Sequence, residues 1–254
     1  MGFVITKEQL DKHFNLGLRK FIGARALGVM YETKPEIVKR LLPPPLEPTD
    51  SPGGLIFIAE YPKTNMGVGY KESALYIRCQ YDGENGTYCL SMQITAESRM
   101  HNGRDVFGLP KKLADINVEK EGNKVHGWVE RNGVRFVDIK AEMTGSLPAL
   151  PPQGPTFLFK AMPRIDLTPG FDGPVLLCRQ QTDVEMQSLE VGTAEVVFNE
   201  SVDDPWHEIE ITNVNAAFFL VSDTIMQPGK VLAEVDPEGF LPHYYKMTDF
   251  YYGD

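Results

Sequence analysis

The chain has 254 residues, of which 42% are hydrophobic and 24% are charged, and this composition excludes a disordered or fibrous protein. Its formal net charge of -10, with no run of Lys and Arg, excludes a nucleic-acid-binding surface, which needs clustered cations to neutralise phosphates. The first residues lack the apolar core of a signal peptide, and no apolar stretch is long enough to span a bilayer, so we expect a cytoplasmic protein without a membrane or nucleic-acid partner.

Metal and nucleotide chemistry find no support in the sequence. The three cysteines are an odd number without CxxC spacing, which favours reduced thiols over disulfides or a zinc site. His101 and His207 have no partners at the spacing of metal ligands. The motifs HExxH, Walker A, GxGxxG and GxSxG are absent, so we expect no metal and no bound cofactor.

The first sixty residues predict two short helices and a strand. The N-terminal segment has helical periodicity, and residues 26–31 are typical of a strand. Residues 33–42 then predict a helix, with Thr33 as N-cap, Pro35 near the start and Glu36 in the position of a capping box.

The rest of the chain predicts mainly strands. Two turn signals, DGENG at residues 82–86 and Asn-Gly at residues 132–133, indicate hairpins, and a proline-rich crossing at residues 147–155 interrupts the pattern without ending it. The aromatic and β-branched runs are residues 54–60, 74–81, 87–94, 124–131, 134–143, 156–162, 174–179 and 194–198. Further helices are expected near residues 214–226 and at the C-terminus. We therefore predict one domain, residues 1–254, that is mostly β (α+β) and forms a closed or nearly closed antiparallel β-barrel with a few flanking helices.

One segment carries a chemical signal. The residues at 103–115 are GRDVFGLPKKLAD, in which Lys111 and Lys112 follow an almost uncharged, turn-rich stretch. This segment resembles the active-site segment of the acetoacetate decarboxylase superfamily, which has Gly-Arg-(Glu/Asp), a short spacer and Pro-Lys-Lys-Leu. Residues 29–48 resemble the family's early strand, helix and proline-rich turn, and GYKES at residues 69–73 resembles the segment with its active-site glutamate. The resemblance implies the fold of that family.

The resemblance implies that Lys111 forms a Schiff base with a keto group. The reaction needs a neutral amine, whereas an ordinary lysine, with a pKa of about 10.4, is protonated at pH 7. Desolvation can supply the difference, and acetoacetate decarboxylase is itself the standard example of such a lysine. We expect Phe107 and Leu109 to form an apolar lining. Lys112, a secondary candidate for substrate binding, should face away, because neighbouring side chains on an extended segment point to opposite sides.

Glu72, in GYKES, matches the family's carboxylate that handles protons near the imine. The alternative is an ordinary ion pair with a lysine. Because a direct carboxylate contact would favour the ammonium form, we expect a catalytic Glu72 to be distant, protonated or linked through water.

Two family positions depart from the decarboxylase pattern. The arginine that precedes the early strand aligns with Ala24, with Arg25 one residue out of register, and a one-residue shift turns a strand side chain to the other face. The second family carboxylate aligns near Phe57, with Glu60 out of register. The pocket is therefore expected to be more apolar, with Arg25 and Phe57 as candidate substrate-binding residues. Arg104 either has a structural role or meets a substrate carboxylate.

The C-terminal MTDFYYGD adds two tyrosines to the candidates. Some members of the superfamily join pyruvate to aldehydes and dehydrate the product, which requires another proton donor. Tyr252 as catalytic residue, with Tyr251 beside the substrate, would supply one if the tail covers the pocket. The alternative is an aromatic plug that closes the barrel or packs between subunits.

Together these features predict a cofactor-free lyase that forms a lysine Schiff base with a small keto acid. The two out-of-register positions favour aldol, retro-aldol or dehydration chemistry on pyruvate-type keto acids and aldehydes over decarboxylation of acetoacetate. A non-catalytic barrel that binds a small ligand is the alternative from another class. The family also implies a homo-oligomer.

Overall fold

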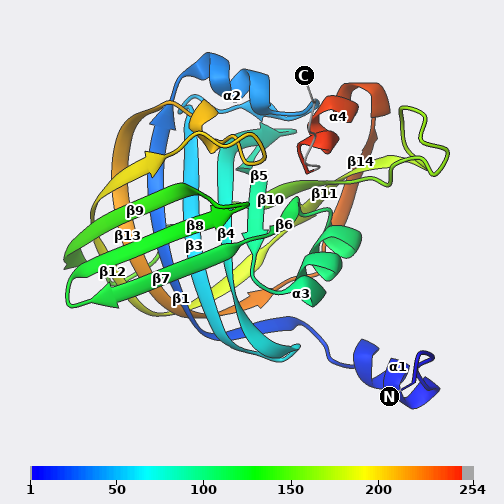
Figure 1. Ribbon diagram of the computed structural model, residues 1–254, viewed down its shortest axis with the longest axis horizontal. Helices are drawn as coiled ribbons and strands as arrows, with labels where there is room; N and C mark the ends of the chain where they lie inside the picture. The colour runs from blue at the N-terminus through cyan, green and yellow to red at the C-terminus, as the bar shows by residue number, and fades with distance from the viewer. Residues whose placement is uncertain (1, 248–254) are drawn as a thin grey trace.

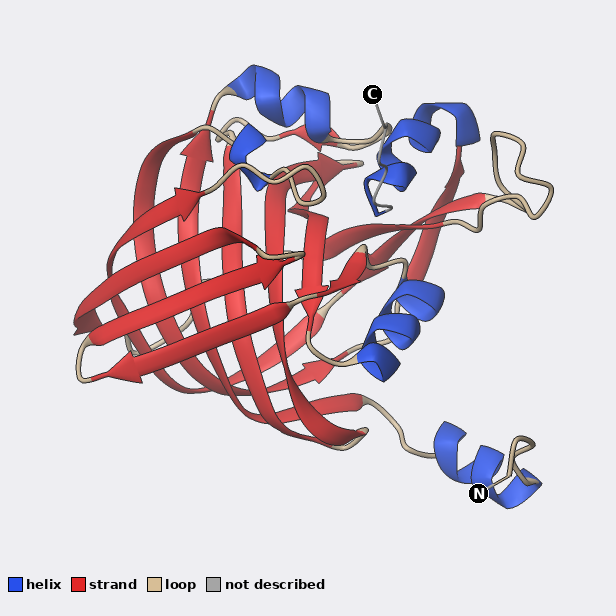
Figure 2. Cartoon of the chain, in the orientation of Figure 1, coloured by secondary structure: helices blue, strands red, loops and turns tan. Residues whose placement is uncertain are grey.

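The computed structural model describes residues 2–247, which form one large curled sheet with helices outside it (Figures 1 and 2). The strands are β1 (Arg19–Thr33), β2 (Glu47–Pro48), β3 (Gly53–Thr64), β4 (Gly67–Tyr81), β5 (Glu84–Ile94), β6 (Lys111–Leu113), β7 (Asp115–Glu121), β8 (Lys124–Arg131), β9 (Val134–Ser146), β10 (Thr156–Lys160), β11 (Val175–Gln180), β12 (Thr182–Phe198), β13 (Ile211–Met226) and β14 (Lys230–Val235). The helices are α1 (Lys7–Phe14), α2 (Pro35–Leu41), α3 (Glu97–Asn102), α4 (Pro237–Tyr244), the π-helix Gly103–Phe107 and the 3₁₀-helices Trp206–Glu208 and Tyr245–Met247.

The predicted mostly β (α+β), barrel-like fold, closed or nearly closed, is confirmed in class and differs in two details: among residues 2–247 the sheet is not closed, and it is mixed rather than purely antiparallel. The strand order is β14-β11-β10-β5-β4-β3-β1-β13-β12-β9-β8-β7, with β2 beside β4 and β6 beside β5, so the sheet has two ends and stays open within the described residues. The sheet is also mixed, because β5 pairs in parallel with both β6 and β10. Between β5 and β6 the chain crosses over through α3 and the π-helix, and such a crossover is what makes parallel pairing possible.

Local signals placed two hairpins correctly, β4–β5 and β8–β9. Asp82 and Gly83 have φ of 50° and 76°, and Asn132 and Gly133 have φ of 51° and 78°. Both pairs lie in the left-handed region that a tight hairpin turn requires and that Asn, Asp and Gly tolerate best.

Two local predictions are corrected. The helix α2 is present, but its N-cap is Lys34, without a side-chain capping bond. Thr33 instead ends β1, and its hydroxyl donates to the Glu210 carbonyl at 2.8 Å, so it is not available as a cap. Residues 214–226 belong to β13 rather than to a helix, because this segment lies between β1 and β12 and pairs with both.

The sheet curls over itself to enclose the larger core. Strands β7, β8, β9 and β12 pass in front of β1, β3 and β4 in Figure 1, and apolar side chains of both layers fill the space between them. Members of this core include Leu27, Val29, Ile56, Ile58, Leu75, Ile116, Val125, Val129, Val137 and Ile139. Each fully buried side chain of this kind contributes about 1.5–3 kcal/mol.

A second core joins α2 and α4 to β4, β5, β10 and β11. Phe240 of α4 stacks on Phe159 of β10 with ring centroids 4.6 Å apart, which fixes the C-terminal helix beside the crossover segment. Helix α1 lies apart from the sheet in Figure 2 and has no buried residues. Among the described residues, no helix combines the length and the apolar composition that a membrane crossing would need.

Candidate active site

The short strand β6 carries both lysines of the motif into the interior. It lies parallel to β5, with Lys111 in register with Met92, and the side chain of Lys111 is buried. The turn before β6 depends on Gly108, which has a φ of 77°. Gly103 of the π-helix packs directly on the lysine, since a Cβ atom there would lie 2.6 Å from its Cε. The motif's first glycine therefore leaves room for Lys111.

Glu72 of β4 meets Lys111 directly. The Nζ atom donates to Glu72 Oε2 at 2.6 Å, and relative exposures are 4% for Lys111 and 7% for Glu72. Of the three expected arrangements, the distant and the water-linked carboxylate are wrong. The contact is the direct lysine–glutamate pair that the sequence left as the alternative, and it is buried where an isolated charge would be costly, so each group depends on the other.

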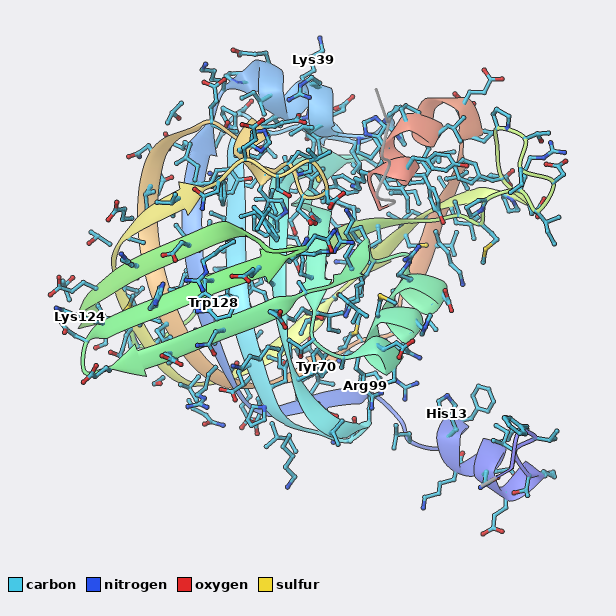
Figure 3. All side chains as sticks on the ribbon, viewed as in Figure 1. His13, Lys39, Tyr70, Arg99, Lys124 and Trp128 are labelled. Atoms are coloured by element: carbon cyan, nitrogen blue, oxygen red, sulfur yellow. The ribbon has the colours of Figure 1, made fainter. Side chains whose placement is uncertain are left out.

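Three tyrosines surround this pair. Side chains alternate along a strand, so Tyr70 and Tyr76 of β4 share a face with Glu72, and Tyr61 pairs with Tyr70 from β3. Burial raises the pKa of all three phenols well above 10, and the Glu72 carboxylate adds to each shift. The Nζ atom of Lys111 lies 5.9 Å from the centroid of the Tyr70 ring, which Figure 3 labels. These phenols remain neutral proton donors at physiological pH.

The tyrosines were missed from the sequence alone. The signal for Tyr70 and Tyr76 was their even spacing from Glu72, two and four residues, which places all three on one face once residues 67–81 are read as a strand. Tyr61 had no such signal, because its position beside Tyr70 depends on the register between β3 and β4.

Ala24 and Arg25, the two residues nearest the expected place of the family's arginine, are neighbours on β1. Ala24 is buried, whereas Arg25 points to the other face and pairs with Glu60 at 2.5 Å, with 53% of its side chain exposed. Ala59 lies opposite Glu72 in the β3–β4 register and adds another small side chain. The structure therefore does not bring Arg25 to Lys111.

The predicted apolar lining forms one cluster. Leu109 is buried in it, and both Phe57 and Phe107 pack against it. Phe57 pairs with Ala74, two residues from Glu72, so it lies on the face of the carboxylate. The buried members are Ala74, Cys89, Met92, Leu109 and Leu158.

Lys112 lies in a separate polar network. Its Nζ atom donates to the Asp203 carbonyl and lies 3.6 Å from Asp204 Oδ1. The buried carboxylate of Asp204 also accepts from Arg131 at 3.1 Å and from Gln93 at 3.0 Å. The structure thus places Lys112 in a network of fixed acceptors, away from Glu72.

Arg104 lines a cavity on the outer side of the motif. The cavity has a volume of about 450 Å³, and Leu109 also lines it. Arg104, on the π-helix, is hydrogen-bonded to the Tyr244 side chain. The cavity is lined by His101, Arg104, Asp105, Gly108, Leu109, Phe159, Lys160, Ala161, Met162, Asp172, Pro174, Leu176 and Tyr244.

A further buried amine, Lys246, was missed from the sequence. It donates to the Tyr88 hydroxyl and lies 4.3 Å from the centroid of that ring. Burial lowers its pKa to about 7, against a smaller opposite effect of Cys89. It lines a cavity of about 10 Å³, room for about one water, together with Cys89 and Pro110. Lys111 does not line either cavity, but Pro110, the residue before it, lines the smaller one.

The remaining expectations concern the tail and metals. Tyr251 and Tyr252 lie outside the described residues. Within residues 2–247 there is no group of three or more His, Cys, Asp and Glu side chains suited to a metal ion. Cys79, Cys89 and Cys178 are free thiols, and burial raises the pKa of each.

Comparison with known proteins gives consistent results. The family model Acetoacetate decarboxylase (ADC) matches residues 5–235. The acetoacetate decarboxylase of Burkholderia cenocepacia strain HI2424 is 27% identical over 234 residues, covering 86% of this chain and 90% of the relative. The acetoacetate decarboxylase of Burkholderia ambifaria strain MC40-6 is 26% identical over 232 residues, with the same coverage of 86% and 90%.

Two solved structures show the same fold. The crystal structure of acetoacetate decarboxylase from Legionella pneumophila has a TM-score of 0.79 and 22% identity, covering 86% of this chain and 88% of that chain. The enduracididine biosynthesis enzyme MppR complexed with pyruvate has a TM-score of 0.72 and 17% identity, covering 85% of this chain and 91% of that chain.

Proposed function

Because the chain belongs to the acetoacetate decarboxylase family, we propose that it is a cofactor-free lyase in which Lys111 forms an imine with a small keto acid. The observation that carries this proposal is the buried contact of 2.6 Å between Lys111 Nζ and Glu72 Oε2. A buried amine with one carboxylate and an apolar lining has the chemistry of a Schiff-base lysine, since the carboxylate can take the proton that keeps the amine inert.

The steps follow from this arrangement. Glu72 accepts a proton from the Lys111 ammonium, and the free amine attacks the carbonyl carbon of the keto acid. The carbinolamine then loses its hydroxyl group as water, with a proton from Glu72 or a neighbouring phenol, and leaves a protonated imine. The imine nitrogen takes up the electron pair of a breaking C–C or C–H bond, which gives an enamine. Protonation of the enamine, or its attack on an aldehyde, and hydrolysis of the imine free Lys111.

For the fate of the enamine, we favour aldol, retro-aldol or dehydration chemistry on pyruvate-type substrates. Ala24 and Phe57 stand where the decarboxylase pattern has an arginine and a carboxylate. The neutral phenols of Tyr61, Tyr70 and Tyr76 beside Glu72 supply the extra proton donors that condensation and dehydration need.

Decarboxylation of acetoacetate is the second candidate. It is supported by the curated relatives, which are acetoacetate decarboxylases at 26–27% identity over 86% of the chain. A buried and mainly apolar setting around the imine also favours loss of carbon dioxide, because it desolvates a carboxylate that departs as a neutral molecule.

Borohydride trapping tests the proposal. The protein is incubated with pyruvate or with acetoacetate and reduced, and peptide mass spectrometry locates the added mass. We expect a substrate-dependent adduct on Lys111 that is absent from Lys111→Met and retained in Lys124→Met, a surface control on β8. No adduct with either keto acid would overturn the proposal and favour a non-catalytic ligand-binding protein.

A second assay separates the two reactions. Carbon dioxide release from acetoacetate is compared with consumption of an aldehyde in the presence of pyruvate. We expect aldehyde consumption and little carbon dioxide. Rapid carbon dioxide release without condensation would replace the favoured chemistry with decarboxylation, leaving the imine mechanism intact.

A further inference from the structure

The reacting amine is closed off from solvent, yet a large cavity lies directly behind the segment that covers it. Lys111 is only 4% exposed, and Gly103 of the π-helix packs on its side chain. Arg104, the next residue, lines the cavity of about 450 Å³ on the other side. Successive residues of the π-helix therefore contact Lys111, through Gly103, and the cavity, through Arg104. Single-turn π-helices occur frequently at functional sites.

The cavity has the size and lining of a small-molecule site. Its volume lies in the range of about 300–1,000 Å³ that ligand pockets occupy, and apolar side chains dominate its walls. The hydrogen bond between Arg104 and the Tyr244 side chain anchors the guanidinium between the π-helix and α4. A guanidinium has five N–H donors, so one phenol leaves several for a ligand.

The charged side chains of the cavity lining balance. Arg104 and Lys160 are its cations, and Asp105 and Asp172 are its carboxylates, so binding of an anion depends on direct contact with a cation. Asp172 Oδ2 accepts the Ile165 N–H at 3.1 Å. In a chain with a net charge of -10, a small anion is repelled by most of the surface and needs such a local cation.

We propose that this cavity is the approach site of the anionic keto acid and that Arg104 captures its carboxylate before the keto group reaches Lys111. The proposal rests on the imine chemistry above and adds a binding step outside the reacting centre. A planar guanidinium matches a carboxylate with two parallel hydrogen bonds, which a lysine does not reproduce. Lys160 contributes only positive potential, so we expect its effect on keto-acid binding to be smaller than that of Arg104.

The test compares charged and neutral ketones. The rate of reductive trapping on Lys111 is measured with pyruvate and with acetone, which has the ketone without the carboxylate. In Arg104→Met, we expect the second-order rate constant for pyruvate to fall about 10- to 100-fold, the range for losing a hydrogen bond to a charged group. The rate constant for acetone stays within about twofold, which also shows that the variant is folded.

Matched variants sharpen the result. Arg104→Lys should recover part of the pyruvate rate, and Lys160→Met should lower it a few-fold. Lys124→Met, which Figure 3 labels and which does not line the cavity, should leave it unchanged. Equal losses for pyruvate and acetone in Arg104→Met, or no loss for either, would overturn the capture role. Failure of the imine mechanism itself has a different signature, which is the absence of any Lys111 adduct in the unaltered protein.

Discussion

The two adjacent lysines of β6 lie in opposite kinds of surroundings. Lys111 meets one carboxylate, Glu72, and otherwise faces phenols and an apolar cluster. Lys112, one residue along, meets the Asp203 carbonyl and Asp204, a carboxylate that is further held by Arg131 and Gln93. Both lysines are buried, so burial does not distinguish them.

The difference lies in the polar partners of each amine. Lys112 lies among several fixed acceptors that hold it in place, whereas Lys111 donates to the Glu72 carboxylate beside an apolar cluster. The strand pleat produces this contrast from two identical residues, since it sends neighbouring side chains to opposite sides. The comparison therefore supports the proposed reactive role of Lys111 and favours a structural role for Lys112.

The largest effect is expected for Lys111→Met, which removes the amine but retains most of the side-chain volume. Imine trapping should disappear, and turnover should fall by at least about 10⁴-fold, as for the loss of a covalent nucleophile. Reductive trapping with pyruvate and acetoacetate measures the change. A full adduct on another lysine of this variant would contradict the assignment.

Glu72→Gln should separate proton transfer from packing. The amide still accepts a hydrogen bond from Lys111 but cannot take its proton, so we expect imine formation to slow by about 10²- to 10⁴-fold. The urea midpoint should change little. Glu84→Gln serves as the matched control, because Glu84 forms an exposed ion pair with Arg179. An unchanged trapping rate in Glu72→Gln would exclude the carboxylate from catalysis.

Lys112→Met should show the reverse pattern. It removes a cation from the buried Asp204 and a donor from the Asp203 carbonyl, so we expect a loss of about 3 kcal/mol in the free energy of unfolding. Trapping per folded molecule should stay within about twofold. Urea unfolding measures the stability, with Lys34→Met as an exposed control that should change little. A large fall in trapping with intact stability would place Lys112 in the site.

Much of the fold was predictable because its signals are local. Aromatic and β-branched runs marked most strands, Asn132 and Gly133 marked a hairpin, and the motif placed Lys111 on an extended segment. The parallel pairs of β5 and the open edges were not predictable in this way, since strand order depends on contacts distant in sequence. The helical reading of residues 214–226 failed because pairing on both sides outweighs local preference.

The residues of the candidate site also differ in whether local signals or contacts distant in sequence place them. Glu72 and Lys111 were proposed from the family resemblance of two short segments, and the structure brings them into contact. The alternation of side chains along β6 separates Lys111 from Lys112. Tyr61 and Lys246 were not found, because their places depend on strand register and on the docking of the C-terminal helices. Their neighbours in space are distant in the chain, and no spacing rule connects them.

The last prediction extends the comparison to a third buried amine, Lys246, and concerns a pH dependence of stability. Its pKa falls from 10.5 to about 7, mainly through burial, so between these values the unfolded chain holds a proton that the folded protein lacks. Stability due to this group therefore rises with pH across that window, by at most about 1.4 kcal/mol per pH unit.

Lys246→Met should remove this rise. Urea unfolding at several pH values between 7 and 10 measures the difference in stability between the variant and the unaltered protein. Cys89 and Tyr88, whose pKa values are raised, are present in both proteins, so their contributions largely cancel in this difference. Parallel curves for the two proteins would show that Lys246 stays protonated in the fold, with the Tyr88 hydroxyl and ring sufficient to hold its charge.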